Sequence, residues 1–284
     1  GDVYDDAYEY AMKLADERHL TFIHPFDDLD VATGQGTIAM EIVQELPTVD
    51  YILVPVGGGG LVTGVSTLAK MLNPKIKVIG VEPKNAASMT EALKNDGPVT
   101  LPSANTIADG TAVKRVGTKI FPYCKENIAQ MLTVDDSRLI GAFLNMVENH
   151  KMIVENSGLL PVAALDQLDL KGKKAVLVLS GGNMDVITMS SVVQHGLIQQ
   201  DRIFTVSVLL PDKAGELVKV AAAIADQNGN VIKLEHNQFV SINRNASVEL
   251  RITMESYGTN HKQQILKALE EKGYQPKVVD TKLY

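Results

Sequence analysis

Up to about residue 199, short apolar segments alternate with segments whose apolar residues recur at helical spacing. The helical spacing predicts helices over Asp2–Glu17, Gly36–Leu46, Leu61–Leu72, Asp136–His150 and Leu159–Leu168. The short apolar segments predict strands at Leu20–Ile23, Tyr51–Val56, Lys77–Val81 and Lys174–Leu179. Because Tyr51–Val56 is apolar throughout, we expect it to be buried on both faces of a parallel sheet. The alternation predicts an α/β fold with an open, mostly parallel sheet and crossover helices.

Beyond residue 200 the pattern changes to strands that alternate apolar and polar residues. We expect strands at Ile203–Leu210, Val231–Val240, Ser247–Ser256 and Gln275–Asp280, and helices at Ala214–Gln227 and Asn260–Lys272. The order β-α-β-β-α-β is that of a ferredoxin-like unit. The sequence therefore predicts two domains, residues 1–199 and 200–284, with Ser190–Arg202 as the linker.

Composition and charge narrow the function classes. The chain has 284 residues and a net charge of −7, so no broad basic face is available and we expect no nucleic-acid partner. No apolar segment approaches the roughly 18 residues of a membrane helix, so we expect no membrane partner. Cys124 is the single cysteine, which excludes an internal disulfide and fits a reducing, cytoplasmic compartment. We expect Cys124 to be a buried apolar residue, and the histidines show no metal-ligand spacing.

The first candidate site is a run of four glycines, Gly57–Gly60, between a predicted strand and a predicted helix. Without Cβ atoms, consecutive backbone N–H groups can converge on one point, and the start of the helix adds partial positive charge. This arrangement predicts a phosphate-binding turn. The turn holds no Lys or Arg and does not match the P-loop pattern, so the amides must carry most of the binding.

Two other interpretations of the glycine run are open. A dinucleotide-binding turn would need glycine or alanine where Val62 or Thr63 stands, although Glu82 lies about 20 residues further on, near the position of a ribose-binding acid. A simple tight turn needs one or two glycines and leaves the others unexplained.

A second candidate site is Ser180-Gly181-Gly182-Asn183, which follows a predicted buried strand. Ligands of open α/β sheets lie beyond the carboxyl ends of the strands, so we expect this segment and the glycine run to face one crevice. The alternative is that Ser180 caps a helix predicted over Asp185–Gln194.

Together, four motifs in this order resemble a known family. They are Gly34-Gln35-Gly36-Thr37-Ile38, Val54-Pro55-Val56-Gly57-Gly58-Gly59-Gly60-Leu61, Thr106-Ile107-Ala108-Asp109-Gly110 and Leu179-Ser180-Gly181-Gly182-Asn183. The chain resembles the threonine and serine dehydratases of the fold type II pyridoxal-phosphate enzymes, a group that includes serine racemase. The segment from Asp201 resembles an ACT domain, with Asp212–Leu217 as its first strand-to-helix turn, and this combination is typical of threonine ammonia-lyases.

The resemblance implies a cofactor, a reaction and site residues. The cofactor is pyridoxal 5'-phosphate, and the reaction is dehydration of L-threonine, or of L-serine, with 2-oxobutanoate and ammonia as the products from threonine. A neutral serine at the pyridine nitrogen makes the ring a weaker electron sink, which suits loss of a β-hydroxyl. Glu155 aligns with a carboxylate near the ring, or is a charge in the first turn of a helix. The cofactor-binding residues implied are Gly57, Gly58, Gly59, Gly60, Leu61 and Ser180.

The resemblance also shows where this sequence departs from the family. The lysine that forms the Schiff base lies in a Ser-x-Lys-x-Arg-like segment upstream of Gly1, and no such pattern occurs in the chain. Lys13 lies on the acidic first helix, so we expect the chain alone to be inactive, as the later part of a longer dehydratase. Where relatives bind a divalent metal, this chain has Glu82, Ala86 and Ser88. Serine in place of aspartate removes a charged ligand, so we expect no tight divalent site, and a monovalent ion stays open.

The ACT resemblance implies regulation by a small amino acid such as isoleucine or valine, held between two such units. Asp212 would accept from its ammonium group, Gly215 would allow close approach of the backbone, and Asn230 would face it. The alternative is an oligomerisation module that binds nothing, and in either case we expect a homodimer or homotetramer. Alternatives for the whole chain are an amino-acid-sensing fragment and a serine racemase-like isomerase.

Overall fold

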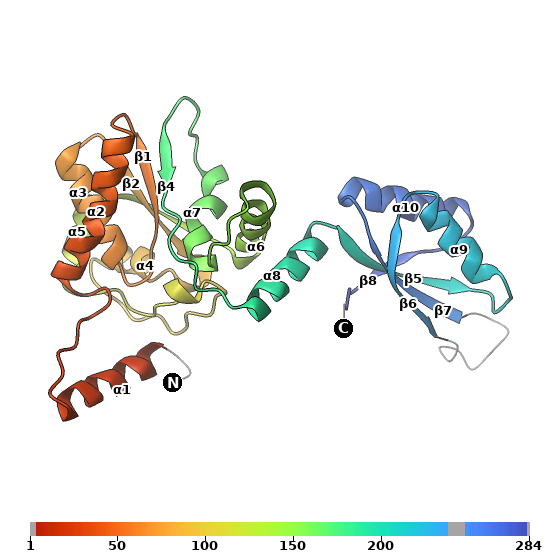
Figure 1. Cartoon of the computed structure of the whole chain (residues 1–284), viewed down its shortest axis with the longest axis horizontal. Coiled ribbons are helices and arrows are strands. Elements are labelled where there is room, and N and C mark those ends of the chain that lie inside the picture. Colours follow the sequence, from red (N-terminus) through yellow and green to blue (C-terminus); the bar gives the residue numbers. More distant parts are fainter. Residues whose placement is uncertain (1–3, 238–247, 283–284) are drawn as a thin grey trace. The chain divides into compact units, whose positions relative to one another are not determined.

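The computed structural model describes residues 4–237 and 248–282. The chain divides between Val186 and Ile187 into two compact units, and each unit has its own sheet of four strands (Figure 1). The expected boundary between residues 199 and 200 falls at the end of helix α8 (Val186–Gln199), so the segment expected to be a linker is largely helical.

The first unit is built on a parallel sheet, as predicted. Its strands are β1 (Tyr51–Pro55), β2 (Lys77–Pro83), β3 (Ile128–Val134) and β4 (Ala175–Leu177), in the order β3-β2-β1-β4. All three pairings are parallel, and β1 lies between β2 and β4. The side chains of Ile52, Leu53 and Val54 are fully buried, because helices cover both faces of the sheet.

Figure 1 shows the helices of the first unit on the two sides of this sheet. One side carries α2 (Leu29–Glu45), α3 (Gly60–Leu72) and α5 (Phe121–Asn127), and the other carries α6 (Asp136–Asn145) and α7 (Leu160–Ala163). A π-helical turn, Met146–His150, continues α6, and short 3₁₀ turns flank α7 where a single helix was expected. Helix α4 (Ser88–Lys94) follows β2.

Helix α2 begins earlier than the pattern predicts. Asp28 caps it by accepting from the N–H groups of Asp30 (2.9 Å) and Val31 (3.1 Å), so the helix starts at Leu29 rather than Gly36. Glycines at the contact allow α2 and α3 to approach closely. A Cβ built on Gly64 would lie 2.0 Å from the carbonyl oxygen of Ala32.

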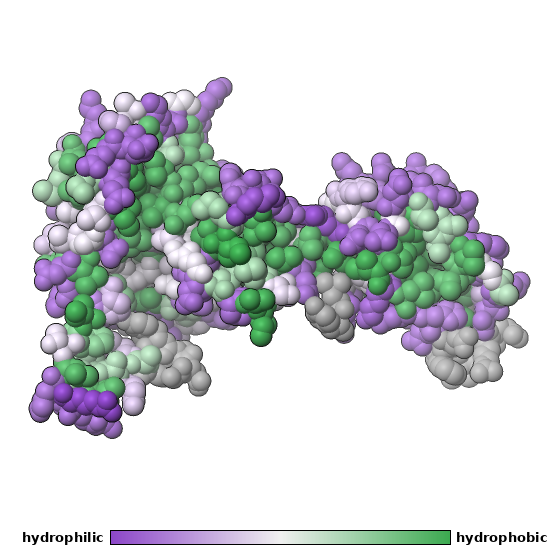
Figure 2. Space-filling model, viewed as in Figure 1, coloured by the Kyte–Doolittle hydropathy of each residue, from purple (hydrophilic) through white to green (hydrophobic). Residues whose placement is uncertain are grey.

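The segment before α2 is irregular, so the prediction of a strand at Leu20–Ile23 is wrong. Leu20 and Ile23 are 57% and 67% exposed, and they pair with no described strand. Figure 2 shows hydrophobic surface between α1 (Tyr4–Glu17) and the body of the unit. Phe22 instead packs edge-on against the ring of Tyr8, with 5.5 Å between the centroids.

The second unit has the predicted β-α-β-β-α-β order. Its antiparallel sheet has the order β6-β7-β5-β8, and α9 and α10 pack on one face of it (Figure 1). Phe204, Val206 and Val208 alternate toward this core. The expected end of the second strand at Val240 lies outside the described residues. The elements are β5 (Ile203–Leu210), α9 (Glu216–Ala225), β6 (Asn230–Asn237), β7 (Val248–Glu255), α10 (Thr259–Glu271) and β8 (Lys277–Val279).

Among the helices in the described ranges, none has both the length and the apolar character that crossing a bilayer requires.

Candidate functional site

The glycine run forms the turn between β1 and α3, and it is tightly packed. Gly59 is left-handed (φ 104°), a conformation that strongly favours glycine. A Cβ built on each glycine would come close to a neighbour: Thr111 Cα at Gly57 (3.0 Å), the Phe26 ring at Gly58 (2.3 Å), Ile120 at Gly59 (2.6 Å) and Phe26 Cα at Gly60 (2.8 Å). Packing therefore accounts for all four glycines, which corrects the expectation that a structural turn would leave some unexplained.

The stronger sign of a binding site is the hydrogen bonding of the backbone groups in this turn. The carbonyl of Gly58 accepts from the N–H of Gly117 (3.0 Å), and that of Gly59 accepts from the N–H (3.0 Å) and the hydroxyl (2.7 Å) of Thr63. By contrast, none of the N–H groups of residues 57–61 donates to an acceptor in the described part of the chain. Unpaired N–H groups at the start of a helix are typical of an anion site.

A cavity of about 340 Å³ lies against this turn. It is lined by all four glycines, by Leu61, by the segment 109–113, and by Glu155 and Ser180. The structure thus brings together every residue that the sequence predicts near the cofactor, and both glycine-containing segments reach one cavity. Its described lining holds two acidic residues, Asp109 and Glu155, and no Lys or Arg, so an anion would be bound by backbone amides and hydroxyl groups and not by a charged side chain.

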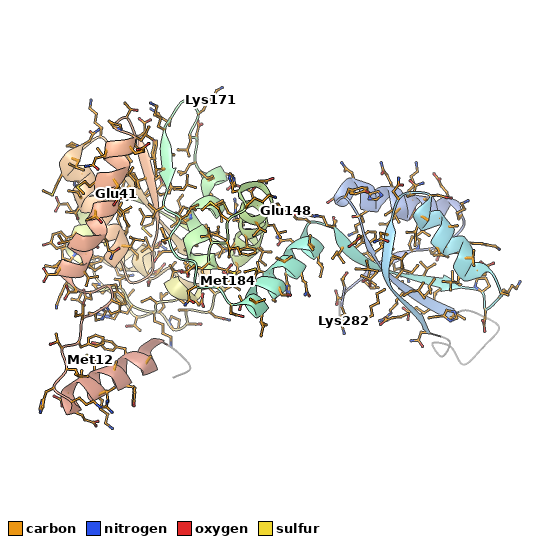
Figure 3. The ribbon with its side chains drawn as sticks, viewed as in Figure 1. Met12, Glu41, Glu148, Lys171, Met184 and Lys282 are labelled. Carbon is orange, nitrogen blue, oxygen red and sulfur yellow. The ribbon has the colours of Figure 1, made fainter. Side chains whose placement is uncertain are left out.

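Ser180 lies in the loop that leads from β4 to α8, in which Figure 3 labels Met184. Helix α8 begins at Val186, so Ser180 is too distant to cap it, and that alternative is wrong. The backbone of Ser180 is pressed against the chain near Gly158, where a built Cβ would lie 2.0 Å from the Ser180 carbonyl oxygen. This contact fixes the loop beside the cavity.

Glu155 connects the two loops that line the cavity. Its carboxylate accepts from the N–H of Asn183 (2.9 Å), and its own N–H donates to the carbonyl of Gly181 (3.3 Å). A Cβ built on Gly181 would lie 2.3 Å from this carboxylate, and one on Gly110 would lie 3.1 Å away. Glu155 precedes a 3₁₀ turn, and its side chain makes no capping hydrogen bond there. The alternative of a first-turn helix charge is therefore wrong.

Two anchoring residues were missed by the sequence reasoning. Asp136 accepts from the hydroxyl of Thr106 (2.5 Å) and the N–H of Ile107 (3.0 Å), which holds the loop that leads to residue 109. In the sequence Asp136 resembles an ordinary acidic residue in the first turn of a helix. Phe26, which covers Gly58, lies in an irregular segment without periodicity. Its partners are distant in sequence, so no local signal identifies it.

Glu82 is a buried carboxylate at the end of β2. It is 0% exposed and accepts from the N–H groups of Met89 (2.6 Å) and Thr90 (2.9 Å) and from the Thr90 hydroxyl (2.7 Å). Burial raises the pKa of Glu82 to about 7, and these hydrogen bonds oppose the rise. The hydroxyl of Ser88 is buried nearby without a partner among the described residues. Across the described ranges, no group of three or more His, Cys, Asp or Glu side chains is placed to hold a metal ion.

Cys124 is a buried thiol, and its burial disfavours the reactive thiolate form. It is 0% exposed, its Sγ lies 3.0 Å from the hydroxyl of Thr63, and burial raises its pKa to about 12. The expectation of a buried, apolar cysteine is confirmed.

The candidate effector residues lie on two elements of the second unit. Asp212 and Gly215 belong to the loop between β5 and α9, where Gly215 is left-handed (φ 92°) and a built Cβ would meet nothing within 4 Å. Asn230 starts β6, and its amide donates to Glu255 (2.8 Å). The loop is thus open to a ligand, whereas the Asn230 side chain is already bonded to the neighbouring strand.

Comparison with known proteins supplies the family. The model of the family described as "Pyridoxal-phosphate dependent enzyme" matches residues 1–181. An L-threonine ammonia-lyase of Thermotoga maritima is 35% identical over 280 residues, covering 98% of this chain and 70% of that protein. An L-threonine ammonia-lyase of Geobacter sulfurreducens is 38% identical over 274 residues, covering 95% of this chain and 68% of that protein.

Solved structures are similar over a smaller part. The processed form of threonine deaminase isoform 2 from Solanum lycopersicum has a TM-score of 0.64 at 36% identity, covering 68% of this chain and 57% of that one. A serine racemase from Dictyostelium discoideum has a TM-score of 0.58 at 36% identity, covering 63% and 59%. The chain therefore spans less than two thirds of the length of these solved relatives.

We predict that Gly59→Ala destabilises the protein by about 1–3 kcal/mol, because alanine is strained at this φ and its Cβ would overlap Ile120. Gly34→Ala is the matched control. It lies within α2 with nothing within 4 Å of a built Cβ, so alanine should stabilise the helix by about 0.5–1 kcal/mol. Urea unfolding of both variants measures the difference, and equal effects would contradict the packing argument.

A second prediction concerns Glu82 and pH. The pKa of Glu82 is about 7 in the folded protein against 4.5 ordinarily, so the folded state binds more protons in this range. The contribution of Glu82 is complete below pH 4.5 and is lost as the pH rises through 7. The free energy of unfolding should therefore fall by about 3 kcal/mol more in the wild type than in Glu82→Gln between these limits.

The control for this prediction is Glu41→Gln, at an exposed position on α2 (Figure 3). Unfolding by urea is measured for the three proteins from pH 4 to pH 8. Curves for the wild type and Glu41→Gln should run parallel, and a parallel curve for Glu82→Gln would show that its carboxyl does not titrate as described.

Proposed function

The chain belongs to the pyridoxal-phosphate dependent enzymes, and from that premise we propose that it forms the phosphate-binding part of an L-threonine ammonia-lyase. The reaction is dehydration of L-threonine, and of L-serine, with 2-oxobutanoate and ammonia as the products from threonine. One observation carries the proposal. The unpaired N–H groups of residues 57–61 share a cavity with Ser180 and Glu155.

The residues of this cavity fit pyridoxal phosphate. The N–H groups of Gly57–Gly60 and Leu61 would bind the phosphate, because they have no protein acceptor in the described chain. The four glycines carry no Cβ atoms of their own, and the packing around the turn leaves no room for any. Ser180, on the opposite loop of the same cavity, would face the nitrogen of the ring. When bound, this cofactor withdraws electrons from the substrate carbon that loses its proton.

Ser180 and Glu155 have different parts in this proposal. The Ser180 hydroxyl is neutral and would hydrogen-bond the ring nitrogen without adding a negative charge, which limits electron withdrawal and favours loss of a hydroxyl group. One carboxylate oxygen of Glu155 accepts a hydrogen bond from the N–H of Asn183. Its part is to orient the Ser180 loop beside the glycine turn.

In this proposal, the lysine that anchors the cofactor does not come from the residues that line this cavity. Among the described residues that line the cavity there is no lysine. We therefore expect the chain alone to bind the cofactor through its phosphate and not to convert threonine.

The ammonia-lyase is favoured over a racemase by the sequence match that extends into the second unit. The match to the Thermotoga maritima ammonia-lyase covers 98% of this chain and therefore includes most of the second unit. Solved structures do not separate the two functions, since the threonine deaminase covers 68% of this chain and the racemase covers 63%. A regulated lyase accounts for both units with one function.

For the second unit we propose an ACT domain, on residues 200–284, that binds a small amino acid such as isoleucine or valine. Its β-α-β-β-α-β order and the open loop around Gly215 support this. The ligand's ammonium would be accepted by Asp212, and Gly215 would let the backbone approach it. Two copies of the unit would enclose the ligand in a homodimer or homotetramer, and the ligand regulates the enzyme if it favours one arrangement of subunits.

The cofactor proposal predicts a preference that rests on the phosphate. Pyridoxal 5'-phosphate should bind the whole chain at least tenfold more tightly than pyridoxal, because the amides of residues 57–61 have nothing to hold on pyridoxal. Titration followed by absorbance measures both affinities. After borohydride treatment, peptide mapping should find no one lysine of this chain that is specifically labelled with the pyridoxyl group. Equal affinities, or binding of NAD in place of the phosphate ester, would overturn the assignment.

The effector proposal is tested by titrating isoleucine and valine into the whole chain with calorimetry. Heat of binding should be lost in Asp212→Asn, because the ammonium group loses its charged acceptor. Asp226→Asn, at the end of α9, is the control and should bind as the wild type does. Silence at millimolar ligand in the wild type would favour an oligomerisation module that binds nothing.

A further inference from the structure

We propose that Phe26 and His24 are positioning residues that clamp the glycine turn in its anion-binding shape. The inference rests on the proposed function, because it assigns these two residues to the same phosphate site. Neither is required by the sheet or the helices, since both lie in the irregular segment between α1 and α2.

Phe26 covers one side of the turn. A Cβ built on Gly58 would lie 2.3 Å from two ring atoms of Phe26, and one on Gly60 would lie 2.8 Å from its Cα. Ile120 and Met89 cover the other side, at 2.6 Å and 2.8 Å from a Cβ built on Gly59. The turn is therefore held between an aromatic ring and two aliphatic side chains.

The turn needs such support because its own hydrogen bonds do not fix its amides. The carbonyls of Gly58 and Gly59 are hydrogen-bonded, but the N–H groups of residues 57–61 donate to no acceptor in the described chain and so do not hold the turn in shape. Glycine backbone without restraint visits many conformations. Without Phe26, the turn loses one wall and its glycine backbone is free to take other conformations.

His24 holds Phe26 in place. Its Nδ1 accepts from the N–H groups of Phe26 (3.3 Å) and Asp27 (2.9 Å), and its ring meets the Phe26 ring edge-on with 4.5 Å between centroids. Because Nδ1 accepts, the neutral ring carries its proton on Nε2. Burial lowers the pKa of His24, which favours this neutral form, and Lys119 acts in the same direction.

The groups around His24 complete the clamp. Asp27 and Asp28 favour its charged form, and the ring of Tyr8 from α1 packs against it at 5.4 Å. The carboxylate of Asp27 accepts from the N–H groups of Lys119 (2.7 Å) and Ile120 (3.3 Å). Asp27 thereby ties the Phe26 side of the turn to the Ile120 side.

The test compares variants of the whole chain by NMR of the Gly58–Gly60 amides, first without ligand. In the wild type we expect rigid amides, with order parameters of about 0.85. In Phe26→Ala we expect order parameters below about 0.6. Phosphate titration then follows the same signals. Affinity for inorganic phosphate and for pyridoxal 5'-phosphate should fall at least tenfold in Phe26→Ala.

Four further variants separate positioning from general damage. His24→Ala should resemble Phe26→Ala, whereas His24→Asn should restore rigid amides and phosphate affinity, because its Oδ1 can accept where Nδ1 does. Phe22→Ala is the control. It removes a ring of the same kind that packs on Tyr8 and His24 and is not among the atoms nearest the glycines. It should leave the Gly58–Gly60 signals unchanged. Phe26→Leu keeps the fold if alanine does not.

The readout without ligand keeps the two proposals distinguishable. Rigid amides in Phe26→Ala, or in Phe26→Leu where it replaces alanine, or equal mobility in His24→Asn and His24→Ala, would overturn the clamp. Amides that depend on Phe26 while the wild type binds neither phosphate nor pyridoxal 5'-phosphate would uphold the clamp and refute the phosphate site. Tighter phosphate binding in Phe26→Ala would show that the ring blocks the turn, and would overturn the proposal.

Discussion

Everything in the first unit depends on a set of backbone N–H groups that lack a protein acceptor in the described chain. They belong to residues 57–61, at the point where the buried strand β1 gives way to a helix. A donor left without a partner on burial costs about 1–3 kcal/mol, so such a turn persists where it opens to a cavity and a ligand or water can accept. The cavity beside it supplies that opening.

The absence of Cβ atoms in the four glycines serves both packing and binding. They let Phe26, Ile120 and Thr111 pack against the turn, and they let its amides reach the cavity. The described lining of the cavity has two carboxylates and lacks Lys and Arg. Binding of an anion there therefore depends on hydrogen-bond geometry and not on net charge. Hydrogen bonds weaken steeply with angle, so the rigidity of the turn matters more here than in a site built from lysines.

The sequence predicts those parts whose signals are local. The apolar run at Tyr51–Val56 and the periodicity after Leu61 locate β1 and α3 to within one residue. The start of helix α2 is predicted seven residues late, at Gly36 rather than Leu29, and the contact of Gly36 with α3 is not a local property. The predicted strand at Leu20–Ile23 fails for a related reason, since an apolar run forms a strand only where a neighbouring strand is available. The site residues follow from motifs, whereas Phe26 and Asp136 act through partners distant in sequence.

The relative position of the two halves of the cavity depends on a short pairing. Strand β4 pairs with β1 at three positions, Tyr51 with Ala175 through Leu53 with Leu177. One further bond follows, from the N–H of Val178 to the carbonyl of Leu53 (2.9 Å). Beyond it, the chain toward Ser180 leaves the sheet. Contacts with the segment Glu155–Gly158 must then fix that loop, and Glu155 bonds it at both Gly181 and Asn183. A carboxylate that joins two loops therefore acts here as part of the framework, and the sheet alone would leave the distance between Ser180 and the glycine turn undetermined.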